Sequence, residues 1–380
     1  MGTISDKLMR IINTKEDIRQ ALISKGYDVP TSIPFKEYAK MILDLPCKVD
    51  SFPDIEGIVA RYSASGLTNE QMAANPVWVD KIGNGHDLQL KNFAWKGMSG
   101  VGGYVADIDE WGTNSTAAYF ERNSIKITAT FKENVSLGLL YHNIKLRQSC
   151  VLKVTGIPEG CDAFLDDRLG NRFYMSEDGV YEIIPSNFLA EALYFSIEKY
   201  PERWYGSKLT IEQLPLYPGA LVFDGVDDYG VCDNFPILTK EKGYTVVVLR
   251  QWDQDFLNTT LTGGLLSTRN YSTGEGVAFG KIESSNKGYW NLGAGGIIDF
   301  AKSPFTWQTS KQYNNVGILK GDKNHGKPLC VGCGLSGGQQ CGRFAIWELV
   351  FLDHDATEEE LTKIKDYFVK TYPWLFPGQA

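Results

Sequence analysis

The sequence predicts a mainly β protein, and three observations support this prediction. Aromatic residues make up 12% of the 380 residues and 39 residues are glycine, a composition that suits half-buried sheets joined by many turns. Short apolar runs separated by turn residues recur along the chain after residue 50. The chain is also longer than one compact core usually accommodates, so we expect two or three domains.

Charge and cysteine content narrow the class of protein. The net charge of −8 disfavours a nucleic-acid partner. No apolar run approaches the roughly 18 residues of a membrane helix, and Asp6, Lys7 and Arg10 interrupt the start of the chain, so we expect neither membrane insertion nor export by the general pathway. The 7 cysteines are odd in number and sparse, which predicts reduced thiols in a bacterial cytoplasm.

Residues 1–46 predict two short amphipathic helices. The first begins with the capping-box-like pair Thr14 and Asp17 and ends at Gly26, and the second runs from Pro34 to Pro46. Helices of this length do not bury two apolar stripes on each other alone. We therefore expect the segment to dock on a partner, on copies of itself or on the next domain. The alternative is a helical hairpin packed on its own chain.

This segment resembles the N-terminal helical segment of tailed-bacteriophage structural proteins. The resemblance lies in residues 4–8, 13–26, 29–30 and 33–39. The resemblance covers only a small part of the chain. It implies that residues 1–46 are a virion-attachment or assembly segment that precedes a variable distal domain.

From residue 217 the pattern predicts strand after strand. An acidic turn at 224–228 joins the runs 220–223 and 229–232 into a hairpin, and later runs have the spacing of a β-sandwich: 244–249, 265–266, 277–279, 288–292, 313–319 and 343–352. Thr357 and Glu360 form a capping box before Leu361, Ile364 and Phe368. We expect one terminal helix there and no other helix in this half.

Three separated motifs resemble the concanavalin A-like, or laminin-G-like, jelly-roll family. They are LVFDGVDDY at 221–229, the pair AIWEL at 345–349 and DATEEEL at 355–361, and IVARY at 58–62 with Asp80 and GNGHDLQL at 83–90. In that family the last of these precedes the acidic hairpin by a couple of dozen residues, whereas here the gap exceeds a hundred. The resemblance therefore implies a jelly-roll domain of residues 51–110 plus 217–380 that carries an insert.

The insert, residues 111–216, has a strand pattern of its own, with runs at 124–131, 136–141, 149–155, 179–185, 191–198 and 208–214. A segment of this length can close a small antiparallel sandwich, and exposed loop tips tolerate insertions. We thus expect a concanavalin A-like jelly-roll sandwich with an inserted small β-sandwich and a short N-terminal helical segment. Tandem domains are the alternative.

Catalytic motifs are missing from the sequence. No glutamate is followed two residues later by aspartate, which rules out the Glu-x-Asp-x-x-Glu pattern of laminarinase-type glycoside hydrolases. Residues 334–338 match Gly-x-Ser-x-Gly, but glycines rather than a helix follow. No His-Glu-x-x-His motif and no phosphate-binding loop occur. We expect no enzymatic activity, although folding can still assemble a carboxylate pair.

Two groups of residues are candidate metal ligands. Asp224, Asp227 and Asp228 offer oxygen ligands for calcium, as related lectin-like domains use near such loops, although a turn alone accounts for them. Cys330, Cys333 and Cys341, with His325 nearby, offer ligands for zinc, but the usual second pair is missing. Thiols in a glycine-rich loop are the favoured alternative to zinc, so calcium is the one cofactor that we carry forward as possible.

Five aromatic residues lie in or beside loop-rich stretches, where their rings can stack on sugar rings: Trp252, Tyr271, Tyr289, Trp290 and Trp307. The alternative for each is packing in the core.

The resemblances imply a structural bacteriophage virion protein, such as a tail or head fibre, that binds host-surface glycan or decorates the particle. It would assemble in the host cytoplasm with other virion proteins and with copies of itself, a trimer being the expected state. The alternatives are a purely architectural subunit, a polysaccharide depolymerase and a bacterial surface glycan-binding protein.

Overall fold

The computed structural model divides the chain into two compact units, Met1–Asp54 and Ile55–Ala380. It describes residues 15, 18, 52–105, 108, 112–113, 118–123, 125–133, 139–144, 149–184, 187, 193–198, 201–236, 238, 242–253, 263–267, 278–281, 287–290, 296–299, 304–309, 329–335 and 339–378. Lys15 and Ile18 are helical, and the rest of the helical segment predicted for residues 1–46 lies outside the described residues.

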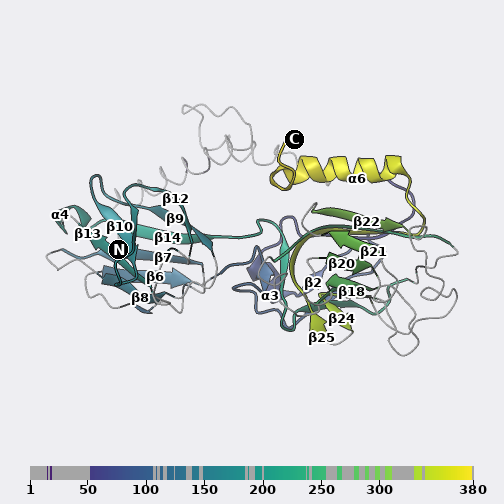
Figure 1. Ribbon diagram of the computed structural model, residues 1–380, viewed down its shortest axis with the longest axis horizontal. Helices are drawn as coiled ribbons and strands as arrows, with labels where there is room; N and C mark the ends of the chain where they lie inside the picture. Colours follow the sequence, from purple (N-terminus) through teal and green to yellow (C-terminus); the bar gives the residue numbers. More distant parts are fainter. Residues whose placement is uncertain are drawn as a thin grey trace. The chain divides into compact units, whose positions relative to one another are not determined.

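The second unit is mainly β, as the sequence predicts. Its described strands form four sheets (Figure 1), and their pairing is antiparallel apart from one parallel contact between Gly264 and Cys341. No helix in the described part of the chain is long and apolar enough to cross a membrane.

A six-stranded sheet is organised around one long strand, β26 (Arg343–Leu352), in which nine consecutive residues are buried. One edge of β26 pairs along its length with β17 (Thr245–Trp252), which in turn pairs with β22 (Phe305–Thr309). The other edge is shared by β1 (Ile58–Ser63) and β15 (Leu221–Asp224). The sheet ends at β4 (Gly100–Val101), which pairs with β15.

A ten-stranded sheet holds the remaining strands of the same two regions: β2 (Val77–Trp78), β3 (Leu88–Lys91), β16 (Tyr229–Cys232), β18 (Gly263–Ser267), β19 (Ala278–Lys281), β20 (Lys287–Trp290), β21 (Gly296–Asp299), β23 (Leu329–Val331), β24 (Cys333–Leu335) and β25 (Gln339–Cys341). One hydrophobic cluster joins it to the six-stranded sheet. Tyr62, Phe223 and Phe344 enter the cluster from the six-stranded sheet, and Trp78 and Val331 enter from the ten-stranded sheet.

Helix α6 (Glu358–Thr371) begins with the predicted capping box and packs on the other face of the six-stranded sheet (Figure 1). The Thr357 hydroxyl oxygen accepts a hydrogen bond from the backbone N–H of Glu360, and the Glu360 carboxylate accepts one from the backbone N–H of Thr357. The ring of Phe368 lies 5.8 Å from that of Phe305 on β22. Three short helices of the described residues were not predicted: α3 (Asn69–Ala74), α4 (Pro201–Trp204) and the 3₁₀ turn η4 (Pro373–Leu375).

Two five-stranded sheets lie between β4 and β15 in the sequence. The strand orders are β11–β10–β13–β8–β5 in one sheet and β12–β9–β14–β7–β6 in the other. Each of these described strands pairs within its own sheet. The strands are β5 (Gly112–Thr113), β6 (Ala118–Asn123), β7 (Lys126–Phe131), β8 (Leu139–Ile144), β9 (Cys150–Thr155), β10 (Asp162–Asp166), β11 (Arg172–Met175), β12 (Gly179–Ile183), β13 (Leu193–Glu198) and β14 (Lys208–Leu214). A second cluster, which includes Leu152, Phe195 and Trp204 of helix α4 (Pro201–Trp204), fills the space they enclose.

The chain leads into these two sheets and leaves them at adjacent points. The backbone N–H of Leu216 donates to the carbonyl of Gly103 at 2.9 Å, and that of Tyr217 donates to Gly102 at 2.8 Å. Gly102 has a φ of +86°, and a Cβ atom there would lie 2.8 Å from Pro215. Only glycine allows the two segments to approach so closely.

Candidate functional site

The acidic turn 224–228 joins β15 of the six-stranded sheet to β16 of the ten-stranded sheet. Phe223, at the end of β15, is buried in the shared core and fixes the start of the turn. Gly225 then adopts a φ of +78°, and a Cβ atom there would lie 2.9 Å from the Cβ of Arg343. The turn therefore depends on glycine at this position, and the sheets on both sides hold it in place.

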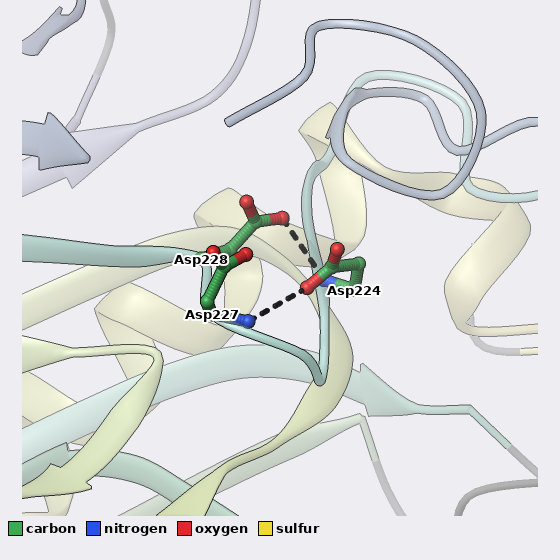
Figure 2. A group of neighbouring side chains, drawn as sticks. All are labelled: Asp224, Asp227 and Asp228. Carbon is green, nitrogen blue, oxygen red and sulfur yellow. Dashed lines mark hydrogen bonds between the residues drawn. The ribbon is translucent and has the colours of Figure 1, made fainter. Parts of the chain in front are cut away.

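The structure brings the three predicted calcium ligands together. One carboxylate oxygen from each of Asp224, Asp227 and Asp228 lies within 4.8 Å of the others (Figure 2). The carboxylate of Asp224 accepts hydrogen bonds from the backbone of Val226 at 2.8 Å and of Asp227 at 3.4 Å. The carboxylate of Asp228 accepts from the backbone of Asp224 at 3.1 Å and from the hydroxyl of Ser99 at 3.0 Å. Ser99 had no signal in the sequence.

Burial changes the chemistry of Asp228. Its side chain is fully buried, and this desolvation, together with the charge of Asp224, raises the pKa of Asp228 to about 7. Asp224 is half-buried and Asp227 is exposed. Calcium needs six to eight oxygen ligands, and backbone and hydroxyl donors already occupy three carboxylate oxygens of this group. The hydrogen bonds that stabilise the turn are a sufficient reason for aspartate at these positions. Calcium binding stays a prediction.

The predicted aromatic contacts fall into three groups. Trp252 is 3% exposed and packs in the core against Phe344, with ring centres 5.1 Å apart, so it is a core residue and not a ligand contact. Trp307, on the edge strand β22, is 38% exposed beside Phe305 and keeps a ring surface for a ligand. Tyr289 and Trp290 lie in β20, whose side chains are not described, and Tyr271 lies outside the described residues.

The cysteines correct the prediction of reduced thiols. Cys333 and Cys341 face each other across β24 and β25 and form a disulfide, with their Cα atoms 4.0 Å apart. Cys330 is buried beside them, and Tyr229 packs against the group. Two of the three thiolates proposed for zinc are therefore joined to each other, and His325 lies outside the described residues. An odd cysteine count carries no information about which cysteines are cross-strand neighbours.

The Gly-x-Ser-x-Gly match does not lie between a strand and a helix. Strand β24 precedes Ser336 and strand β25 follows it, and the two strands pair as a hairpin. A nucleophile elbow requires a helix after the serine. This agrees with the expectation that the match carries no catalytic serine.

A buried ion pair beneath α6 was missed by the sequence analysis. Glu348 of β26 accepts hydrogen bonds from Nε of Arg61 at 3.1 Å, from a terminal nitrogen of Arg61 at 3.2 Å and from the hydroxyl of Tyr372 at 2.7 Å. Arg61 also donates to the hydroxyl of Tyr367 at 2.9 Å. Charged residues inside the apolar runs 58–63 and 343–352 were the available signal. The pair anchors the C-terminal helix to the sheet.

No family model matches the sequence, and no curated protein matches it. Function is therefore inferred from the residues and their geometry.

Proposed function

We propose that the chain is a structural protein of a tailed-bacteriophage virion, a tail fibre, head fibre or related appendage. In this proposal a lectin-like domain attaches to host-surface glycan or decorates the particle. The proposal comes from the sequence resemblances, and one observation carries it furthest: segments that supply the jelly-roll motifs are neighbours in one sheet. Strands β1 and β15 both pair with β26, although 287 residues separate Arg61 of β1 from Glu348 of β26.

The domain boundaries belong to the same proposal. We assign residues 51–110 and 217–380 to a concanavalin A-like jelly-roll domain and residues 111–216 to an inserted β-sandwich. The shared core of the six- and ten-stranded sheets supports the first assignment. The adjacent segments at Gly103 and Leu216 support the second, because an inserted domain needs its two ends close together.

Residues 1–46 complete the proposal as the segment that attaches the protein to the virion. The two amphipathic stripes predicted from the sequence favour assembly with other virion proteins or with copies of this chain, and we propose a trimer. Virion density at the position of the chain would give both its location and its stoichiometry. A monomer at an isolated position would contradict the proposed self-assembly.

A polysaccharide depolymerase is the second candidate, and Asp228 is the observation that favours it. A carboxyl group with a raised pKa close to two further aspartate side chains resembles the acid of a glycoside hydrolase. Against this, a general acid must reach the glycosidic oxygen, and Asp228 is 0% exposed. We therefore propose a binding protein without hydrolytic activity.

Two measurements on the full chain test these functions. We expect the folded protein to bind polysaccharide extracted from the host surface, in a pull-down or on a glycan array. Failure to bind any of these glycans would leave a purely architectural subunit. We also expect no increase in reducing ends when the protein is incubated with the same polysaccharide. Release that disappears in Asp228→Asn would establish the depolymerase instead.

A further inference from the structure

The outer face of the sheet that contains β10, β11 and β13 carries an unusual group of side chains. Side chains on a strand alternate between faces, so Phe164 and Asp166 point away from the core to which Ala163 and Leu165 belong. Across the strands Phe164 is the register partner of Tyr174, and Asp166 is the partner of both Arg172 and Tyr194. We call Phe164, Tyr174, Tyr194, Arg168 and Arg172 the aromatic–arginine face.

Each arginine of this face lies over an aromatic ring. The guanidinium carbon of Arg168 is 4.1 Å from the ring centre of Tyr194, and that of Arg172 is 4.8 Å from the ring centre of Phe164. The rings of Phe164 and Tyr174 are 5.4 Å apart. Cation–π contacts and ring packing of this kind fix side chains that would otherwise sample many rotamers.

The face is also held by hydrogen bonds. Nε of Arg172 donates to Asp166 at 2.9 Å, and another nitrogen of Arg172 donates to the hydroxyl of Tyr174 at 3.3 Å. Arg168 sits in the β10–β11 turn, where Asp167 accepts from the backbone of Leu169 at 2.8 Å and of Asn171 at 3.0 Å. The binding groups are therefore positioned before any ligand arrives, which lowers the entropy cost of binding.

Part of this ordered surface remains open to solvent, while Phe164 itself is only 6% exposed beneath Arg172. Tyr174 is 46% exposed, the side chain of Arg172 is 43% exposed, and Leu169 at the tip of the turn is 63% exposed. Three neighbouring strands span about 10 Å, and alternate residues on one strand lie about 7 Å apart. The platform is thus comparable in size to a disaccharide.

We propose that the aromatic–arginine face binds a neutral polysaccharide, and this inference rests on the proposed glycan-binding function. A hexose has an apolar C–H face, which suits the exposed ring of Tyr174, and a rim of hydroxyls, which suits paired donors and acceptors. Arg172 supplies N–H donors and Asp166 supplies a carboxylate acceptor side by side. A neutral ligand is favoured because the carboxylates of Asp166 and Asp167 offset the charges of Arg172 and Arg168, and the chain carries a net charge of −8.

The test measures binding of the full chain to immobilised neutral polysaccharides (dextran, mannan and a β-glucan), with alginate as the acidic comparison. We expect Tyr174→Ala to weaken binding about tenfold, which corresponds to about 1.4 kcal/mol. Arg172→Gln should also weaken binding because it removes the ion pair, whereas Tyr174→Phe should retain it because the ring remains.

Two variants serve as controls. Tyr119→Ala removes an aromatic residue that is 68% exposed beneath Lys132 on the other sheet of the same region, and we expect unchanged binding. Trp307→Ala removes the exposed ring of β22 and serves as the comparison for that competing location. Thermal unfolding of each variant confirms that the fold is kept.

The outcomes separate the two levels of the proposal. Neutral-glycan binding that survives both Tyr174→Ala and Arg172→Gln would overturn this site and leave the glycan-binding function, and loss in Trp307→Ala would move the site to β22. Binding to alginate alone would overturn the neutral ligand. A folded chain that binds none of these glycans and no host polysaccharide would overturn the function and the site together.

Discussion

Removal of Arg61 should destabilise the chain more than any substitution of an exposed residue. It leaves the carboxyl group of Glu348 buried without its cationic partner. The side chains of Arg61 and Glu348 are 2% and 0% exposed. In Arg61→Met both hydrogen bonds from Arg61 to Glu348 disappear, and those from the Tyr372 and Ser63 side chains remain. Loss of one partner of a buried ion pair costs about 3–5 kcal/mol.

The double variant Arg61→Met/Glu348→Leu is the matched comparison. It removes both charged groups and replaces them with apolar side chains, a change that is often neutral in buried pairs. We therefore expect the double variant to be more stable than Arg61→Met by at least about 2 kcal/mol. The coupling energy between the two sites should reach or exceed the range of about 0.5–3 kcal/mol that is typical of residues in contact. Additive destabilisation by the two substitutions would contradict a direct interaction.

Calorimetry is the suitable assay, because the chain holds two separate hydrophobic clusters that can unfold in separate transitions. For a domain of about 200 residues, a loss of 3–5 kcal/mol lowers Tm by roughly 6–20 °C. Only the transition of the cluster that contains Tyr62 should move. A shift in Tm of less than about 2 °C in Arg61→Met would refute the reasoning, because it would mean that water or another group solvates Glu348.

Four further predictions concern other parts of the structure. Because burial raises the pKa of Asp228 from 3.8 to about 7, the contribution of Asp228 to stability is present below pH 4 and is lost as the pH rises to 7. The free energy of unfolding, measured in urea, should therefore vary less between pH 5 and 8 in Asp228→Asn than in the wild type. Parallel plots of this free energy against pH would contradict the prediction. If the acidic turn binds calcium, 1 mM Ca²⁺ raises Tm in the wild type and not in Asp228→Asn, whereas equal Tm values with Ca²⁺ and EDTA would remove the site. Thr357→Ala should cost about 1 kcal/mol and lower hydrogen-exchange protection in the first turn of α6, while Thr362→Ala in the second turn leaves that cap intact. Non-reducing peptide mapping should find Cys333 joined to Cys341, and reduction should cost about 2.5 kcal/mol for a closed loop of this length; separate peptides would contradict the disulfide.

Local patterns in the sequence predicted those elements whose structure depends on their own residues. The apolar run 343–352 coincides with β26, and the capping box at Thr357 begins α6. The turn 224–228 joins two strands at the predicted positions, but the predicted hairpin is wrong, because β15 pairs with β26 and β16 pairs with β23 in the other sheet. In each of these, one segment contains both the apolar residues and the signal that ends the element.

Elements that depend on distant partners were missed or misjudged. Strands β10 and β11 were not predicted, because Asp162–Asp166 is a short run with four buried residues in succession and shows no alternation. Their neighbour β13 comes from residues about thirty positions further along, and it is the pairing that defines the aromatic–arginine face. Ser99 reaches Asp228 across 129 residues. No window of sequence contains both members of such a contact.

The central place of β26 explains why the motifs of the resemblance lie so far apart in the sequence. Strand β26 joins β1, β15 and β17, so the six-stranded sheet cannot be completed until the last strand of the chain is available. The two five-stranded sheets make no strand pair with β26 and draw on a separate hydrophobic cluster. Residues 111–216 can therefore lengthen the connection from β4 to β15 at a cost that grows only slowly with loop length, while the pairing that positions Arg61 against Glu348 is unchanged. This independence is what allows residues 111–216 to carry the exposed face that we propose as a glycan-binding site.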